Sequence, residues 1–575
     1  MKPTVRIIAL LMSIVMLVFL FASCSNNNDF EVFADETDKI DNEVTGNLPS
    51  TDNTNGDGED NFIFEIVYPS VYVSSMKFDL TDKDLEEYKD KVLLTKQMFA
   101  KNDEVSEDEF RNALYELLSL EAEIETQRDI AYIQYKYDMS NSSAWNNYLY
   151  AYNLHDEAHD LFWGFYSEAK NKNNNLSIVF KDVVQKEYKG NLVSVTPAAD
   201  YYAYEMEVLE GEYNSLKNNG ASDEEIFEVY KKYMIAAEGY AISSNTDNYY
   251  EYASKYNFHR NDTSSQRELI RKYVKEYIVP LCKELGAKHK SYDNKLSGKQ
   301  YSLSNKYLYG KYDSFDKDYL FSYFSSLPKT SGKAMKDAFK NDRVLIGDRV
   351  NSYDGAMVSK IGNTPICYFH EDSTTLDTMS HELGHYYASV VGDSTYYSFD
   401  LKETHSTANS MLLFSYLSDK LDSKAFTSAE LYMVYNWTYQ TILSVIKDEF
   451  DEIIYTLDPS TIKLEDFERI MNELIDEYNI RGLTGSIENQ LLTYWRRLGI
   501  VYPMSNYSYA TAFIASFQIY VKSKDNYVAA TEIYRKIVEE TDYSGNFLLT
   551  IEKAGLTSPY NEQTYKELKK LTKLF

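Results

Sequence analysis

The chain has 575 residues, 44% of them hydrophobic, and its 59 Lys and Arg against 89 Asp and Glu give a formal net charge of −30. A chain of this length can bury a self-sufficient core, as one large domain or as several smaller ones. The charge excludes nucleic acid as a partner, because a phosphate backbone would be repelled. The 54 Tyr residues predict packed interfaces between helices in which phenol groups reach a polar partner.

The N-terminus has the pattern of an export signal. Lys2 and Arg6 precede an almost wholly apolar run, Ile7 to Leu20, and small residues precede Cys24 in Phe21-Ala22-Ser23-Cys24. That last run resembles a bacterial lipobox, which predicts a signal peptide over residues 1–24 and a lipid anchor on Cys24. The alternative is an uncleaved membrane anchor, although the apolar run is short for a spanning helix. Either way, we expect the bulk of the chain to lie outside the cytoplasm.

Residues 25–61 are rich in Asn, Asp, Glu, Gly, Ser and Thr, which predicts a flexible acidic linker. Beyond it, apolar residues recur at helical spacing, and Ser106 and Ser222 stand as helix caps before acidic first turns. Few segments favour strands; Phe62–Val73 is one and Ala356–Tyr368 is another. The sequence therefore predicts a mainly α-helical protein with a small sheet near residue 360.

A break in the helical pattern near residues 285–300 suggests a division into a helical N-terminal region, 62–290, and a second region, 291–575. If Cys24 carries lipid, Cys282 and Cys367 are the remaining cysteines, and two lone thiols are no disulfide framework. We expect both to be small buried residues.

The run His381-Glu382-Leu383-Gly384-His385 has the spacing of a metal site. Its surroundings, Thr375 to Val391, favour a helix that starts around Ser373 or Thr374. Two His four residues apart lie on one face of a helix, where both imidazoles reach one zinc ion. Glu382 is turned away from the ligand direction, where it serves as general base to a zinc-bound water. The pattern predicts a zinc peptidase; two solvated His on a surface helix are the alternative.

A catalytic zinc usually has three protein ligands and one open position. Glu403 is the candidate for the third, because it lies 18 residues after His385 at the start of a second helical run, Glu403 to Leu421. On spacing alone other side chains compete with it, and an imidazole is an equally good zinc ligand. The competitors are Glu371, Asp377, Asp393, Asp400 and His405.

A second pair, His155 and His159, also has the spacing of one helical turn. Asp156 stands where a general-base Glu would be needed, and no third ligand suggests itself. We therefore expect this pair to be structural or on the surface.

These motifs together resemble the M3 metallopeptidases, the group of thimet oligopeptidase and oligoendopeptidase F. The run Glu403-Thr404-His405-Ser406-Thr407-Ala408-Asn409 is similar to the family run that carries the third zinc ligand, which selects Glu403. The resemblance covers roughly residues 80–575 and is strong between 350 and 515. It implies a helical ellipsoid with a deep central channel and one zinc ion at its floor, held by His381, His385 and Glu403, with the catalytic region over 291–575.

The family also places a His and several Tyr opposite the metal, to stabilise the tetrahedral intermediate. Tyr507-Ser508-Tyr509-Ala510-Thr511 is similar to the end of that segment, and Tyr502 lies near its beginning. The family His is absent from Arg497 to Pro503. Losing one such donor costs on the order of 100 to 1,000-fold in turnover.

The resemblance implies a zinc oligoendopeptidase that hydrolyses internal bonds of short, unstructured peptides, and the export signal places it outside the cytoplasm. The missing His motivates an alternative, a peptide-binding lipoprotein with weak or lost turnover. A protease acting on folded proteins is a third possibility that shares the zinc chemistry.

Overall fold

The computed structural model describes residues 66, 71, 76–139, 141–187, 197–218, 220–311, 314–347, 352–353, 355–392, 397–421, 423–483, 485–498, 504–541 and 545–575. The predicted signal peptide and linker, and nearly all of the predicted strand Phe62–Val73, lie outside these residues. Those three assignments stay predictions.

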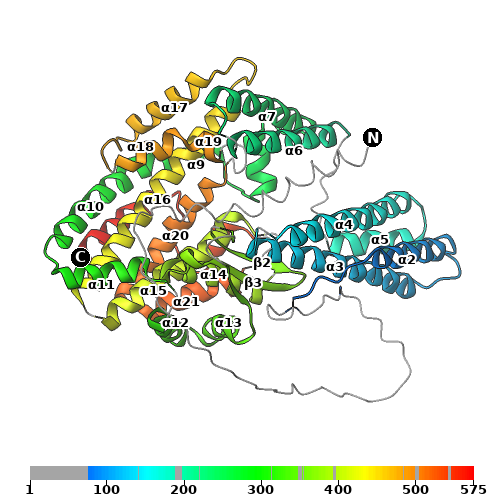
Figure 1. The fold of residues 1–575 in the computed structure, drawn as a ribbon, viewed down its shortest axis with the longest axis horizontal. Coiled ribbons are helices and arrows are strands. Elements are labelled where there is room, and N and C mark those ends of the chain that lie inside the picture. Colours follow the sequence, from blue (N-terminus) through cyan, green and yellow to red (C-terminus); the bar gives the residue numbers. More distant parts are fainter. Residues whose placement is uncertain are drawn as a thin grey trace.

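The first four described helices form a separate bundle, drawn in blue and cyan in Figure 1. They are α2 (Asp82–Ala100), α3 (Glu107–Tyr137), α4 (Ser142–Ala169) and α5 (Asn175–Glu187). The predicted cap of α3 is confirmed, because Ser106 Oγ accepts a hydrogen bond of 3.2 Å from the Glu109 amide. The α3 helix also packs against the small sheet described below, and so joins this bundle to the rest of the molecule.

Further helices and two short π-helical turns follow before the sheet. They are α6 (Pro197–Asn218), α7 (Asp223–Ser243), α8 (Tyr249–Tyr252), η3 (Ala253–Asn257), α9 (Ser264–Tyr273), η4 (Val274–Ile278), α10 (Val279–Asp293), α11 (Gly298–Tyr309), α12 (Ser314–Ser326) and α13 (Lys329–Lys340). Ser222 caps α7 as predicted. The predicted break near 285–300 coincides with the turn between α10 and α11, and both helices pack against α16. As a domain boundary it stays a prediction.

The sheet has the strand order β1-β3-β2, from β1 (Val344–Gly347), β2 (Ala356–Ile361) and β3 (Thr364–His370). Strand β1 runs parallel to β3, and β2 runs antiparallel to it. The segment predicted as one strand, Ala356–Tyr368, is therefore a hairpin, because Gly362 takes a φ of +54° and turns the chain. The small sheet predicted near residue 360 is confirmed.

The C-terminal helices build the main core around α14 (Leu376–Val391), α15 (Phe399–Leu421), α16 (Lys424–Thr456) and α20 (Asn506–Asp525). The others are α17 (Leu464–Glu477), α18 (Gly485–Leu492), α19 (Tyr494–Leu498), α21 (Tyr527–Glu539), α22 (Phe547–Lys553) and α23 (Glu562–Leu568). Helix α15 packs against α14, α16, α20 and α21, and nearly all of its side chains are buried. The mainly α-helical fold is confirmed, and the sheet lies against α14.

Cys282 and Cys367 are both free and buried, as predicted. Within the described residues, no helix is both long enough and apolar enough to cross a membrane.

Candidate metal centre

Helix α14 carries the two predicted His ligands one turn apart. It is capped by Thr375, whose hydroxyl accepts a hydrogen bond of 3.2 Å from the Thr378 amide. The start therefore lies one or two residues later than predicted, because Glu371–Ser373 forms a short 3-10 turn first. The imidazole rings of His381 and His385 lie with their centroids 5.0 Å apart and nearly perpendicular to each other. Both rings thus stand on the same face of the helix.

Helix α15 brings Glu403 to these two rings. Its Oε2 lies 3.5 Å from His381 Nε2, and its Oε1 lies 3.8 Å from His385 Nε2. One nitrogen or oxygen from each of the three residues lies within 4.8 Å of the other two. Of the residues that the structure describes, these three alone form such a group.

The competitors that the structure describes do not join this group. Glu371 is exposed in the 3-10 turn before α14, and the carboxylate of Asp400 accepts hydrogen bonds from α20. Asp377 and His405 are outside the group of converging ligand atoms, and Asp393 is outside the described residues. Burial lowers the pKa of His405 to about 3, although the Ile537 carbonyl opposes this, so its imidazole is neutral.

The charges at the centre fit a cation. Burial opposes protonation of His381, but Glu403, Glu382 and Asp377 outweigh it and raise the pKa of this imidazole. Burial and the charge of His381 lower the pKa of His385 well below its ordinary value. Glu403 Oε1 and Glu382 Oε2 are buried, and neither accepts a hydrogen bond from any described group. Buried acceptors normally have a hydrogen-bond partner, so these two oxygens indicate a site for a further group. Two imidazoles and a carboxylate are the donor set of a catalytic zinc site, and a divalent metal therefore fits here.

Glu382 is fully buried beside the ligands. Burial raises the pKa of its carboxyl to about 8, with His381 acting against this and Glu403 adding to it. Burial, and after it the charge of Glu382, also raises the pKa of the Cys367 thiol on β3. A raised pKa suits a group that accepts and returns a proton.

The two ligand-bearing helices touch at Gly384. A Cβ atom there would lie 2.5 Å from the His405 carbonyl oxygen and 2.7 Å from Ser406 Cα. Next to this contact, Asn409 Nδ2 donates a hydrogen bond of 2.5 Å to the Ser380 carbonyl. A side chain at position 384 is excluded because α14 and α15 approach at backbone distance, and this approach sets the distance from His381 and His385 to Glu403.

Two of the three predicted tyrosines, Tyr507 and Tyr509, lie within the described residues. Tyr502 lies outside the described residues. Tyr509 is buried on α20 with its ring edge-on to Phe399, the first residue of α15, at 5.9 Å. Tyr507 is fully buried; its hydroxyl lies 3.4 Å from that of Tyr560, and the Arg260 guanidinium lies over its ring. The catalytic roles of all three stay predictions.

The second His pair is structural, as expected. His159 Nδ1 lies 2.8 Å from Glu121 Oε1, and His155 Nδ1 lies 3.3 Å from the Arg128 guanidinium. The positive charge of the Arg128 guanidinium disfavours binding of a metal ion at His155. Both imidazoles of α4 instead contact side chains of α3 and so link the two helices.

The chain resembles known proteins in fold but not in sequence. No family description and no curated protein matches the chain by sequence. Solved structures do match. PZ peptidase A, solved with an inhibitor, is 16% identical, with a TM-score of 0.66 over 87% of this chain and 99% of that one. A Bacillus anthracis protein assigned as an oligoendopeptidase F is 15% identical, with a TM-score of 0.57 over 88% and 98%. Metallocarboxypeptidase 1 of Trypanosoma cruzi is 13% identical, with a TM-score of 0.53 over 85% and 99%.

Identities this low carry the fold and no further property. The matches nevertheless span nearly the whole of each solved chain. The protein therefore has the fold of the M3 peptidases, and within it the side chains of His381, His385 and Glu403 converge.

Proposed function

We propose that this protein is a zinc-dependent oligoendopeptidase that hydrolyses internal bonds of short peptides. The observation that carries the proposal is the convergence of His381, His385 and Glu403 beside a buried Glu382. These two imidazoles and one carboxylate would hold a zinc ion with three protein ligands, the number that catalytic zinc sites commonly use.

The residues of the chain divide the work of amide hydrolysis. A zinc ion, when bound, supplies Lewis acidity that lowers the pKa of a water molecule and polarises the scissile carbonyl. Glu382 accepts the proton of the attacking water and returns it to the leaving amine. Burial raises the pKa of this carboxyl to about 8, and a positive charge beside it would lower that pKa and favour the ionised form, which acts as a base. For the developing oxyanion we propose the hydrogen-bond donors that the resemblance implies, Tyr507, Tyr509 and Tyr502.

Glu382→Gln tests this assignment directly. The amide keeps the size of the side chain but cannot accept a proton, so cleavage of an internally quenched fluorogenic peptide should fall by about 100 to 10,000-fold. Zinc content should stay at one ion per chain, because Glu382 is not a ligand. The matched control is Glu465→Gln on the exposed face of α17, which should cleave at the wild-type rate. Full activity in Glu382→Gln would refute the role of this residue.

A peptide-binding lipoprotein with weak or lost turnover is the alternative, motivated by the absent family His near residue 500. In that case the zinc-loaded wild type would retain unmodified peptides without cutting them, as measured by fluorescence anisotropy and mass spectrometry of the same sample. Comparing casein with a ten-residue peptide separates an oligopeptidase from a protease that acts on folded or long chains.

We also propose that the enzyme works outside the cytoplasm, tethered by a lipid on Cys24. The support is the apolar run Ile7–Leu20 and the small residues before Cys24. Mass spectrometry of the membrane-extracted N-terminus should show a lipidated Cys24. A Cys24→Ala variant should leave the membrane fraction, and retention there would count against the anchor.

A further inference from the structure

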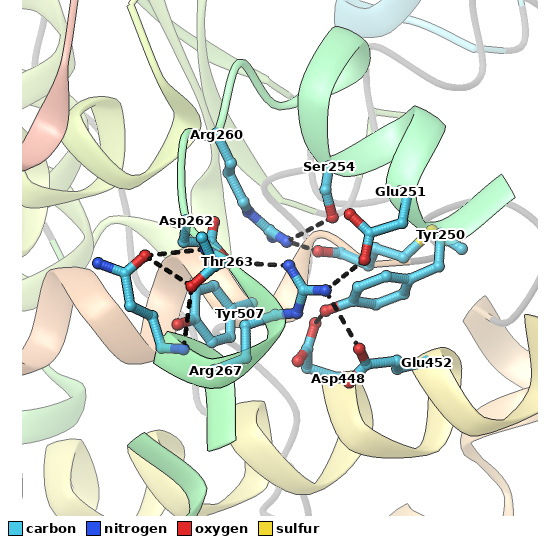
Figure 2. Close-up of polar contacts among 12 residues, drawn as sticks. Tyr250, Glu251, Ser254, Arg260, Asp262, Thr263, Arg267, Asp448, Glu452 and Tyr507 are labelled. Atoms are coloured by element: carbon cyan, nitrogen blue, oxygen red, sulfur yellow. Dashed lines mark hydrogen bonds and ion pairs between the residues drawn. The ribbon is translucent and has the colours of Figure 1, made fainter. Parts of the chain in front are cut away.

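A buried polar cluster lies where α9, α15, α16 and α20 meet, and no step proposed above uses it. Its centre is the Arg260 side chain, which is 1% exposed. Figure 2 shows the guanidinium above the Tyr507 ring, beside Ser254 of η3 and close to a second arginine, Arg267. Arg260 Cζ lies 4.9 Å from the centre of the Tyr507 ring and 5.1 Å from that of Phe258.

Arg260 joins the first turn of α15 to the first turn of α20. Its Nε lies 3.7 Å from Asp400 Oδ2 and donates a hydrogen bond of 3.2 Å to Ser508 Oγ. Ser508 Oγ in turn donates to Asp400 Oδ2 at 3.1 Å, and the Thr511 hydroxyl donates to Asp400 Oδ1. Both oxygens of one buried carboxylate on α15 are thus held by two side chains of α20.

The chain entering α20 is held by the same group. Met504 has a φ of +67°, a conformation that residues other than glycine rarely adopt. Its carbonyl accepts a hydrogen bond from Arg260 Nη2, and its amide donates a hydrogen bond of 2.9 Å to Asp451 Oδ2 on α16. Both the carbonyl and the amide of this left-handed residue are thus hydrogen-bonded to buried side chains, which indicates that the surrounding structure enforces the turn.

The position of the cluster connects it to the metal centre. Asp400 lies three residues before the ligand Glu403, about one helical turn, and Ser508 and Thr511 lie on either side of Tyr509 in the sequence. Tyr509 also packs edge-on against Phe399, the neighbour of Asp400. A shift of α20 along α15 would therefore move Tyr509 relative to Glu403.

Ion pairs of this kind are poor evidence for stability, because desolvation of the charges cancels much of their attraction. Apolar side chains would pack these helices equally well, but they would not fix the helices along and about their axes. Directional hydrogen bonds to both oxygens of Asp400 do fix them, and catalysis is sensitive to displacements of about 1 Å.

We infer that Arg260 and Asp400 are positioning residues that fix α20 on α15, so that Tyr509 stands in a set place relative to the metal ligand Glu403. This inference rests on the proposed function. Neither residue touches the reacting groups; both act through the helices that carry them.

Thr511→Val tests the inference with the least disturbance, because it removes the hydroxyl bound to Asp400 and keeps the shape of the side chain. The matched control is Thr441→Val on α16, where an equally buried hydroxyl donates 2.8 Å to the Trp437 carbonyl. We expect Thr511→Val to lower kcat about 10-fold or more with KM and zinc affinity within about 3-fold. Thr511→Ser should restore kcat, and Thr441→Val should stay within about twofold of wild type.

A second measurement does not depend on activity. Tyr509 is replaced by 3-fluorotyrosine, and the cobalt-induced pseudocontact shift of its fluorine, which depends on its distance and angle to the metal, is recorded in the Co²⁺-loaded protein. The shift should change in Thr511→Val and in Arg260→Lys and stay constant in Thr441→Val.

The outcomes separate the two claims. If wild type cleaves peptides but Thr511→Val keeps its kcat and its fluorine shift, the inference is overturned and the proposed function stands. If cobalt-loaded and zinc-loaded wild type bind metal but cleave nothing, the proposed function fails. The fluorine shift then decides the positioning alone: a changed shift supports it, and an unchanged shift overturns it.

Discussion

Replacing Gly384 by alanine should damage the metal centre more than it damages the fold. Gly384 lies between the two His ligands, at the point where α14 meets α15. The added Cβ would stand 2.5 Å from the His405 carbonyl oxygen and 2.7 Å from Ser406 Cα. Both of these are backbone atoms within a helix, so neither can rotate away, and relief requires the helices to separate by about 1 Å.

The two effects on stability largely cancel. Overpacking of this kind costs about 1 to 3 kcal/mol, and Ala in place of Gly inside a helix returns about 1 kcal/mol. The net destabilisation is then about 0 to 2 kcal/mol. The metal ligands have no such compensation, because Zn–N bonds tolerate only a few tenths of an ångström around about 2.0 to 2.1 Å. A 1 Å separation of His381 and His385 from Glu403 should weaken zinc binding by about 10 to 100-fold, the range seen when supporting residues of metal sites are removed.

Competition with a chromophoric chelator measures the zinc affinity, and urea unfolding of the metal-free protein measures the stability. Gly164→Ala is the matched control, because nothing lies within 4 Å of a Cβ at that position of α4; it should gain about 0.5 to 1 kcal/mol from helix propensity with unchanged zinc affinity. Wild-type zinc affinity in Gly384→Ala would refute the reasoning, since it would mean that the helix contact does not set the ligand geometry.

Three further predictions concern metal, ligand identity and pH. Removal of the metal with a chelator should lower the melting temperature by several degrees, because zinc at 100 times its Kd adds about 2.7 kcal/mol to the folded state; an unchanged melting temperature would contradict the centre, and Zn²⁺ but not Mg²⁺ should restore it. His405→Gln should still bind one zinc per chain in metal analysis, since His405 lies outside the ligand group; a loss of that zinc would reinstate His405 as a ligand. Lys136→Met should raise the free energy of unfolding at pH 7 by about 1 to 2 kcal/mol. Burial lowers the pKa of Lys136 from 10.5 to about 8, and keeping the ammonium charged at neutral pH therefore costs about 3 kcal/mol. Three tyrosine rings around Nζ offset part of this cost. Between pH 8 and 10.5 the unfolded chain holds this proton and the folded chain does not, so the free energy of unfolding of the wild type should rise with pH in that window. The difference in stability between Lys136→Met and wild type should therefore be smaller at pH 9.5 than at pH 7, as measured by urea unfolding at both pH values. An equal difference at the two pH values would contradict this prediction.

The local part of the site follows from the sequence, because it is contained in one helical turn. His381, Glu382 and His385 are fixed relative to one another by the helix alone, and any helix over these residues gives the same arrangement. The start of that helix was less predictable. Ser373, Thr374 and Thr375 are all able to cap it, and only the preceding 3-10 turn shows that Thr375 does so.

Glu403 shows where spacing stops being informative. Residue separation along the chain left several carboxylates and His405 as rivals, and only the resemblance selected among them. Successive residues of an α-helix are rotated by about 100°, so residues 403 and 405, which are about 200° apart around the axis, lie on nearly opposite sides of α15. At most one of them can therefore face the two His ligands on α14. Sequence gives the angle between the two but not which of them faces the metal.

The Arg260 cluster could not be predicted from the sequence. Arg260 is 244 residues from Met504 and 248 from Ser508, and no periodicity in a single segment encodes a contact over that distance. The sequence did predict the general use of tyrosine, with phenol groups that reach a polar partner between helices.

Buried acids are one kind of partner for these phenols. Helix α16 carries buried carboxylates along its length, and phenols from other helices donate to them: Tyr520 to Glu430 at 2.7 Å, Tyr250 to Asp448 at 2.9 Å and Tyr494 to Asp451 at 2.7 Å. A buried carboxylate is costly unless it is hydrogen-bonded, and a phenol satisfies it while its ring fills the space between helices. Tyrosine thus supplies packing and hydrogen bonding from one side chain. Basic side chains join the phenols at two of these acids: Arg271 Nη2 lies 3.1 Å from Asp448 Oδ2, and Lys524 pairs with Glu430.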